Sequence, residues 1–312
     1  MERNILLADD DKMMQEVVSR LLNARGWRVS TADDGLCALE EIARQVPDVI
    51  LLDLNMPRLC GRELLSRLRR DPRTALVPVI ILSGENSPQE KAAEFDIGAD
   101  DYICKPFDAG ELASRIEGAA RRARRLLAAN PLTLLPGGPA IEEEAGARIA
   151  SGAPLAFFYV DIDNFKAYNE NYGYFKGDAA IRKVAGLLTE MQSDLRGEDI
   201  FVGHIGGDDF VLMCSPDRAE AIAGEVASRF DAAVRELYSA EDAGRGYITA
   251  KDRSGTERCF PLMSLSIAIA TNEQRKLDHY AKIADIAAEI KKFLKGRPGK
   301  GGSAFLKDRR RD

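Results

Sequence analysis

The sequence lacks the features of a secreted or membrane-inserted protein. It has five cysteines in 312 residues, scattered and without a CxxC spacing, which indicates neither a disulfide framework nor a zinc site. No apolar run approaches the length that a bilayer requires, and the N-terminal stretch MERNILLADDD reaches acidic residues without an apolar signal-peptide core. We therefore expect a soluble, cytoplasmic protein.

An excess of basic charge is also missing. The chain has 44 lysines and arginines against 50 aspartates and glutamates, which gives a formal net charge of -6. Such a balance argues against nucleic acid or a membrane surface as a main partner. The basic run RRARR at residues 121–125 is interpreted as a solvated helix face. The length suits two domains, each large enough to bury a core.

The first third of the chain alternates short apolar runs with amphipathic segments. Strands are predicted at residues 4–8, 27–30, 48–54, 77–83 and 101–107, and helices at residues 12–26, 35–45, 61–70 and 87–98. Five strands alternating with helices predict an α/β doubly wound parallel sheet. In such sheets the functional side chains lie at the carboxyl ends of the strands.

Reactive side chains stand at four of these strand ends. Asp9 and Asp10 follow the first strand, Asp53 ends the third, Ser83 follows the fourth, and Lys105 follows the fifth. Three carboxylates at one sheet edge repel one another unless a hard cation such as Mg²⁺ lies among them. A nearby ammonium and hydroxyl would suit an incoming phosphoryl group, so the pattern predicts an aspartyl phosphate at Asp53. Taken singly, these residues could equally cap a helix or solvate a loop.

Residues 1–120 resemble a response-regulator receiver domain through the motifs ILLADDD, LLDLNMP, ILSG and YICKPF. The resemblance implies that Asp53 accepts a phosphoryl group from a sensor histidine kinase or a phosphotransfer protein. It also implies that Asp9, Asp10 and the main-chain carbonyl of Asn55 bind Mg²⁺. Such a domain is not itself the output, because phosphorylation changes which surface it presents.

The resemblance assigns three further receiver residues. Ser83 is implied as the switch hydroxyl, Tyr102 as the switch aromatic, and Lys105 as the contact to the phosphoryl group. The Lys105–Pro106 bond is implied to be cis, a state that only bonds to proline reach at low cost.

Residues 121–137 are predicted to form a helical coiled-coil linker that stops at the Asn-Pro of residues 130 and 131. Apolar positions continue at 4-3-4-3 spacing from the last receiver helix, namely Leu112, Ile116, Ala119, Ala123 and Leu126. We interpret Leu112 and Ile116 as packing on the receiver itself, and the rest as a weak seam between two copies of the chain. A weak seam suits a contact that responds to phosphorylation.

Residues 138–312 are predicted to form an α+β palm-like domain. A buried strand ends in VDID, a helix follows, and FVGHIGGDDFVLM predicts a β-hairpin tipped with two glycines and two carboxylates. Asp161 and Asp208, at adjacent strand ends, could hold two Mg²⁺ ions that bridge nucleotide phosphates. Gly206 and Gly207 would let a nucleotide lie against bare backbone. A further hairpin-like segment, residues 244–260, includes an insertion whose role the sequence does not reveal.

Residues 131–300 resemble the GGDEF family of diguanylate cyclases. The resemblance rests on the motifs NPLTLLPGG, VDIDNFKAYNENYG, GGDDF, SLSIAIA and ADIAAEIKKFLKGR. It implies a homodimer in which each copy holds one GTP with Mg²⁺, and a reaction that converts two GTP into cyclic di-GMP and two pyrophosphates.

The same resemblance assigns the catalytic and metal-binding residues. Asp161, the carbonyl of Ile162 and Asp208 are implied as magnesium ligands. Asp208 is also the candidate base for the 3'-hydroxyl, and Lys166 is implied to stabilise the charge of the transition state.

Substrate recognition is assigned to three other residues. Asn169 and Asp178 are implied to read the guanine edge, and Lys292 to contact a phosphate. A carboxylate at position 178 favours GTP, because it can accept from the N1 and N2 donors that adenine lacks.

The chain departs from the family pattern in several places. Asp209 stands where glutamate is usual, which shortens the carboxylate by about 1.5 Å, and a misplacement of about 1 Å can cost on the order of a hundredfold in rate. Tyr174 stands in place of a histidine, and Arg297 lies one residue late. Arg196 and Asp199 spell the RxxD of an inhibitory site one residue too far from the GGDDF motif. These departures leave a second hypothesis open, a degenerate domain that binds GTP or cyclic di-GMP and signals through a protein partner.

Overall fold

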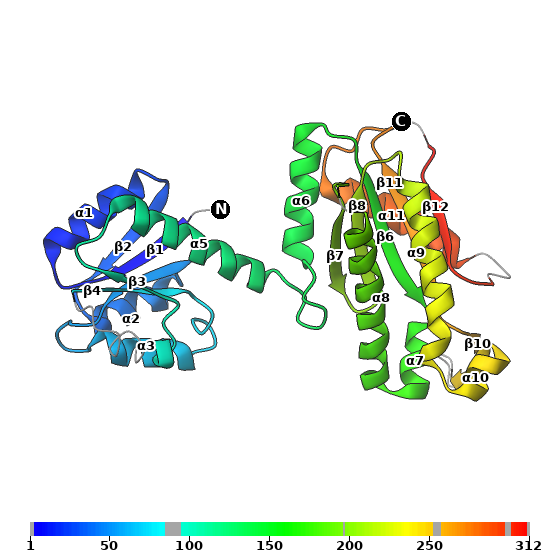
Figure 1. The fold of residues 1–312 in the computed structure, drawn as a ribbon, viewed down its shortest axis with the longest axis horizontal. Helices are drawn as coiled ribbons and strands as arrows, with labels where there is room; N and C mark the ends of the chain where they lie inside the picture. Colours follow the sequence, from blue (N-terminus) through cyan, green and yellow to red (C-terminus); the bar gives the residue numbers. More distant parts are fainter. Residues whose placement is uncertain (1–2, 85–94, 196, 252–256, 297–300, 311–312) are drawn as a thin grey trace. The chain divides into compact units, whose positions relative to one another are not determined.

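The computed structural model describes residues 3–84, 95–195, 197–251, 257–296 and 301–310. The chain divides into two compact units, residues 1–127 and residues 128–312 (Figure 1). Each unit is built on its own five-stranded sheet. Among the described residues, no helix combines the length and the apolar character needed to cross a membrane.

The first unit is a parallel sheet with strand order β2-β1-β3-β4-β5, which is the doubly wound receiver fold predicted from the sequence. Its strands are β1 (Arg3–Ala8), β2 (Trp27–Ala32), β3 (Val49–Asp53), β4 (Val79–Ser83) and β5 (Asp101–Cys104). Its helices are α1 (Lys12–Asn23), α2 (Gly35–Arg44), α3 (Gly61–Arg70) and α5 (Ala109–Leu127). Most of the helix predicted at residues 87–98 lies outside the described residues.

Two apolar cores lie on the opposite faces of this sheet. Alternate residues of a strand point to opposite faces, so Ile50 and Leu52 join α2 and α3 on one side while Val49 and Leu51 join α1 and α5 on the other. The central strands β3 and β4 are therefore buried along their whole length. This burial explains their continuous apolar sequences.

Helix α5 ends earlier than the sequence predicts. Leu112, Ile116 and Ala119 are buried in the receiver core, whereas the side chains of Leu126 and Leu127 are 69% and 64% exposed. The predicted helical linker at residues 121–137 is thus helical only as far as Leu127. Beyond the helix, the side chain of Asn130 accepts hydrogen bonds from the backbone of Leu132 and Thr133 and closes a turn there.

The second unit has a mixed sheet with strand order β12-β11-β6-β8-β7. Its strands are β6 (Ala156–Asp163), β7 (Phe201–Gly206), β8 (Asp209–Cys214), β11 (Ser264–Thr271) and β12 (Ala304–Lys307). Its long helices are α6 (Gly138–Ser151), α8 (Tyr174–Asp194), α9 (Ala219–Ala233) and α11 (Tyr280–Lys295), and the short helix α7 (Phe165–Tyr172) follows β6. Helices α8 and α9 pack on one face of the sheet, and α6 and α11 pack on the other (Figure 1).

A separate group of small elements lies beside α7. It consists of η1 (Val234–Leu237), α10 (Ala240–Arg245), β9 (Tyr247–Lys251) and β10 (Glu257–Pro261). Strands β9 and β10 pair antiparallel, so the hairpin predicted from the sequence is confirmed. The C-terminal strand β12, which the sequence pattern did not predict, pairs with β11 at the edge of the main sheet.

Candidate functional sites

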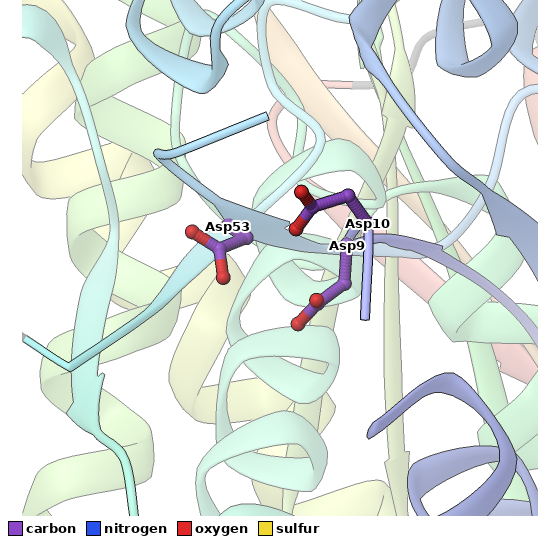
Figure 2. Close-up of side chains that lie close together, drawn as sticks. All are labelled: Asp9, Asp10 and Asp53. Atoms are coloured by element: carbon purple, nitrogen blue, oxygen red, sulfur yellow. The ribbon is translucent and has the colours of Figure 1, made fainter. Parts of the chain in front are cut away.

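The receiver carboxylates come together at the carboxyl ends of β1 and β3. These strands are parallel neighbours, and Ala8 pairs with Leu52, so Asp9 and Asp53 follow at the same edge. Ligand oxygens of Asp9, Asp10 and Asp53 all lie within 4.8 Å of one another, and Figure 2 shows the three side chains close together. The helix cap is supplied instead by Asp11, which accepts from the first turn of α1. Helix capping therefore does not explain Asp9 and Asp10.

Lys105 bridges two of these carboxylates. Its Nζ donates to Asp9 Oδ2 over 2.7 Å and also to the carboxylate of Asp53. Burial raises the pKa of Asp9, and the hydrogen bond from Lys105 opposes this only in part. Burial acts to lower the pKa of Lys105, but the hydrogen bonds to Asp53 and Asp9 prevail and raise it. One ammonium against three carboxylates leaves an excess of negative charge at this edge.

The other predicted receiver residues line the same edge or the strands beside it. Ser83 ends β4 and is buried, with its carbonyl accepting from the backbone of Lys105 over 2.7 Å. Tyr102 lies on β5 with 8% of its surface exposed. The backbone N–H of Asn55 donates to Asp53 Oδ1 over 2.8 Å. The peptide bond between Lys105 and Pro106 is cis, as predicted. The three clustered carboxylates form a hard-oxygen set that fits Mg²⁺.

The GGDDF segment forms the predicted hairpin. Strands β7 and β8 pair antiparallel, with Gly207 and Asp208 between them and an irregularity between His204 and Gly206. Gly206 has φ +150° and Gly207 has φ +58°, conformations that residues with a Cβ rarely adopt. The paired glycines are therefore required by the turn itself, whatever lies against it.

The predicted metal-binding carboxylates meet where β6 and β8 run side by side. Asp161 pairs with Asp209 in the sheet register, and the backbone N–H of Ile162 donates to the carbonyl of Asp208 over 3.3 Å. Asp161 is 2% exposed. Burial raises the pKa of Asp208, and the nearby charge of Asp161 raises it further. This edge of the sheet therefore needs a cation.

Two lysines from α11 supply positive charge at this edge. Lys291 pairs with Asp161 and, over 2.8 Å, with Asp209 Oδ1, while Lys295 Nζ lies 2.5 Å from Asp161 Oδ1. Burial acts to lower the pKa of Lys291, but hydrogen bonds to Asp161 and Asp209 raise it. The sequence predicted Lys292, which is exposed. Lys291 and Lys295 were not predicted, although their spacing of four residues places them on one face of the helix.

The donor set of this edge fits a divalent cation. Asp161 Oδ1 is buried, and its partner among the described residues is the ammonium of Lys295, whose Nζ lies 2.5 Å away. Together with Asp208 and the carbonyl of Ile162, it provides the hard oxygens that Mg²⁺ prefers.

The residues predicted to read guanine lie on the two helices after β6. Asn169 is on α7, and its Oδ1 is buried without a hydrogen-bond donor among the described residues. It packs against Gly177, where an added Cβ would lie only 1.8 Å from Asn169 Oδ1. Asp178 directly follows Gly177 on α8. Asn169 thus presents an unused acceptor.

The remaining predicted cyclase residues lie on the surface. Lys166 is exposed and lies 3.5 Å from Glu170, and Tyr174, the first residue of α8, is 81% exposed. Asp199 accepts from Arg148 Nη2 over 2.8 Å, so its carboxylate is engaged by α6. Arg196 and Arg297 lie outside the described residues. The inhibitory site proposed at residues 196–199 stays a prediction.

His204 was not predicted from the sequence, and it ties the GGDDF turn to the start of the second unit. Its Nε2 lies 3.1 Å from the carbonyl of Gly207 and its Nδ1 lies 3.0 Å from Thr133 Oγ1. Because a carbonyl can only accept, Nε2 carries the proton and Nδ1 accepts from the threonine hydroxyl. The ring stacks on Phe210 at 4.3 Å, and burial lowers the pKa of His204.

These observations define a class of protein. A doubly wound receiver with an acidic pocket and a bridging lysine, followed by a mixed-sheet domain with a glycine-rich acidic hairpin, is the architecture of a response regulator with a nucleotide cyclase output. Residues 5–117 match the model of the response regulator receiver domain, and residues 131–296 match the model described as diguanylate cyclase, GGDEF domain. The chain belongs to the GGDEF family and carries a receiver domain before it.

Individual relatives match the receiver part of the chain. The DNA-binding dual master transcriptional regulator RpaA of Synechocystis is 40% identical over 141 residues, which covers 42% of this chain and 58% of RpaA. The response regulator MprA of Mycobacterium leprae is 42% identical over 120 residues, or 38% of this chain and 52% of MprA. This chain therefore spans about half the length of these curated relatives.

Solved structures of receiver domains also match the first unit. The receiver domain of the Francisella response regulator 1452 is 36% identical and has a TM-score of 0.37, with 39% of this chain and 98% of that chain covered.

Proposed function

We propose that the chain is a diguanylate cyclase controlled by phosphorylation, which converts two GTP into cyclic di-GMP and two pyrophosphates. The observation that carries the proposal is the cluster of the buried Asp161 and the nearby Asp208 with two lysines of α11, Lys291 and Lys295. This group offers oxygens for a metal and cations for a triphosphate at one edge of the sheet. The match to the GGDEF family over residues 131–296 supports the same reaction class.

Guanine recognition is assigned to Asn169 and Asp178. The unused Asn169 Oδ1 and the carboxylate of Asp178 are acceptors, and they match the N1–H and N2–H donors of guanine. Adenine presents no such pair, so leaving these acceptors unpaired would disfavour ATP. Lys166, Lys291 and Lys295 supply positive charge for the phosphates, with Lys166 at the exposed end of the site.

The chemical step follows from the placement of Asp208. Asp208 is the proposed base that takes the proton of the 3'-hydroxyl as O3' attacks the α-phosphorus of the GTP held by a second copy. The bond from the α-phosphorus to the bridging oxygen breaks, and pyrophosphate leaves. A second, equivalent attack closes the ring. Mg²⁺ held by Asp161, Asp208 and the Ile162 carbonyl would offset the negative charge of the triphosphate.

Control is assigned to the receiver. Phosphorylation of Asp53 by a sensor histidine kinase or a phosphotransfer protein would favour pairing of two receivers, and pairing would bring two GTP-loaded units together. Two observations support this control. The carboxylate of Asp53 lies close to those of Asp9 and Asp10 and pairs with Lys105, and α5 ends in two exposed leucines, Leu126 and Leu127.

One observation favours the second hypothesis, a domain that binds nucleotide without turning it over. Lys291 already bridges Asp161 and the short side chain of Asp209, so these carboxylates are neutralised without a metal. A protein that keeps this bridge in the presence of GTP and Mg²⁺ would bind but not react.

Product analysis separates the two hypotheses. The purified chain is incubated with GTP and Mg²⁺, with and without beryllofluoride as a phosphoryl mimic, and the nucleotides are identified by mass. We expect cyclic di-GMP, in larger amount with beryllofluoride, and no product from the matched variant Asp208→Asn. Bound GTP without cyclic dinucleotide under every condition would reject the cyclase. An Asp53→Ala variant as active as the beryllofluoride-treated wild type would reject the control mechanism.

A further inference from the structure

Helix α7 carries Asn169 but has little to hold it in place on its own. It is eight residues long, its N-cap Asn164 has φ 61° and makes no side-chain capping bond, and its C-cap Gly173 has φ +85°. Isolated helices of this length are unstable in water, so tertiary contacts must fix the position of α7. Besides the packing of Asn169 on α8, such contacts come from residues 237–251 and 257–261, a segment that includes α10, β9 and β10.

Three tyrosines join α7 to this segment. Tyr168 and Tyr172, one turn apart on α7, stack at 4.9 Å, and both meet the ring of Tyr238 edge-on at 5.0 and 5.7 Å. The hydroxyl of Tyr168 donates to the carbonyl of Leu237 over 2.7 Å. The hydroxyl of Tyr238 accepts from the backbone N–H of Met263 over 2.8 Å. Each ring is therefore fixed by a polar contact as well as by stacking.

The contact between Tyr172 and Asp242 is charge-assisted. Tyr172 donates its hydroxyl proton to Asp242 Oδ2, and the backbone N–H of Ser239 donates to the tyrosine oxygen over 3.1 Å. The hydrogen bond from Tyr172 lowers the pKa of Asp242, and Arg245 lowers it further. Asp242 is thus held ionised, and hydrogen bonds to ionised groups are shorter and stronger than neutral ones.

The segment itself is anchored in the core. Ile248 and Ala250 of β9 are buried in the same apolar cluster as Tyr168. The carbonyl of Pro261, at the end of β10, accepts from Asn164 Nδ2 over 3.3 Å at the start of α7. Residues 237–251 and 257–261 therefore contact both ends of α7, through Asn164 at its beginning and Tyr172 at its last turn.

We propose that residues 237–251 and 257–261 act as a clamp that positions Asn169 for guanine, with Tyr172 and Asp242 as the positioning residues. The proposal rests on the proposed binding of GTP. Asn169 lies directly after Tyr168 and three residues before Tyr172, so a rotation of α7 permitted by loss of the Tyr172–Asp242 contact would turn Asn169 Oδ1 away from Gly177. Tyr172 belongs to α7 and Asp242 belongs to α10. Both act on the base only through Asn169.

The clamp is tested by nucleotide discrimination in the full chain. Affinities for the α,β-methylene analogues of GTP and ATP, which cannot release pyrophosphate, are measured by calorimetry with Mg²⁺ for the wild type, Tyr172→Phe and Asp242→Asn. Tyr280→Phe, the same change at a tyrosine that packs on Phe157 of the other face, is the matched control. We expect each clamp variant to bind the GTP analogue about tenfold more weakly, the size of one lost hydrogen bond. The clamp variants should bind the ATP analogue as the wild type does. The control variant should bind both analogues as the wild type does.

The alternative outcomes are separable. Equal loss of affinity for both analogues would indicate a general structural role and overturn the clamp, as would unchanged affinity in both variants. Because Asp242→Asn leaves Tyr172 in place, it keeps the test valid where Tyr172→Phe impairs folding. A wild-type protein that binds the GTP analogue but forms no cyclic di-GMP would reject the cyclase and leave the clamp result standing. A wild-type protein that binds neither analogue would overturn both.

Discussion

Asp209 carries one methylene fewer than the glutamate that is usual at its position in the GGDEF family. In the structure its Oδ1 reaches Lys291 over 2.8 Å, and it pairs with Asp161 across the sheet. The short side chain is therefore part of the charge network of the site. Its carboxylate extends less far toward a metal or phosphate beyond Lys291 than the carboxylate of a glutamate would.

Restoring that reach should increase the rate. We expect Asp209→Glu to raise kcat for cyclic di-GMP formation by about tenfold, because the carboxylate extends by about 1.5 Å. Pyrophosphate release at saturating GTP provides the measurement. The control is Asp209→Asn, which keeps the length and removes the charge, and should lower the rate. A fall in kcat for both variants would show that Asp209 already stands at its working distance.

His204 gives the second unit a dependence on pH. Its pKa is lowered in the folded state, so between that value and the ordinary value near 6.5 the unfolded chain binds more protons. The stabilisation is complete above about pH 6.5 and is lost as the pH falls below it. The groups that face the ring are Thr133, the Gly207 carbonyl, Phe210 and the charge of Asp209.

We expect amide exchange protection in residues 201–214, corrected for intrinsic rates, to fall between pH 7.5 and pH 5.5 in the wild type. His204→Gln keeps a donor toward Gly207 but does not titrate, so this variant should lose most of the pH dependence. His279→Gln replaces the chain's other histidine, which is on an exposed helix cap, and should behave as the wild type. An unchanged pH dependence in His204→Gln would assign the effect to other groups.

At the scale of elements, the clearest prediction concerns the end of α5. Leu126 and Leu127 are exposed after the receiver core ends near Ala119 and Ala120. Two charges there should abolish a seam between two copies. We expect Leu126→Glu with Leu127→Glu to remain monomeric with beryllofluoride while the wild type dimerises, as measured by sedimentation. The control is Leu76→Glu, another exposed leucine of the first unit. Dimerisation of the double variant as strong as the wild type would place the contact elsewhere.

Element types were predictable where one local signal dominates. The two glycines of the GGDDF turn and the flanking apolar runs predicted the hairpin, because few residues other than glycine adopt the backbone angles of Gly206 and Gly207. The Asn-Pro pair at residues 130 and 131 predicted where α5 would stop, and the helix ends at Leu127, three residues before it, whereas the apolar spacing alone carries no such signal. Strand β12 has four residues and is held by Asp231, which accepts from Ser303, a contact between residues far apart in sequence.

Some residues of the candidate sites were predicted from the sequence and others were not. Asp9, Asp53 and Lys105 were predictable because parallel strands end at a common edge. Lys291 and Lys295 were missed, although each directly follows an apolar residue of the core, Ile290 or Leu294, at a spacing of four residues. His204 stands in an apolar run, and only the three-dimensional structure brings Thr133 to it.

Over the whole molecule, the two units deal with clustered negative charge in the same way. Lys105 bridges Asp9 and Asp53 in the receiver, and Lys291 bridges Asp161 and Asp209 in the cyclase unit. In each unit the lysine comes from an element distant in sequence from the carboxylates. Charge repulsion at the strand ends is thereby reduced before any ligand arrives, which lets both sites fold in advance of binding.

Strand β12 has a consequence for how the protein behaves at high concentration. It covers one edge of β11, a strand whose eight residues are all buried, and Ser303 Oγ accepts from the backbone N–H of Leu265. An uncovered apolar edge strand is a template for pairing with other chains and for aggregation. The residues that prevent this lie beyond residue 296, where the match to the GGDEF family ends. The colloidal stability of the second unit therefore depends on a tail that its catalytic motifs do not include.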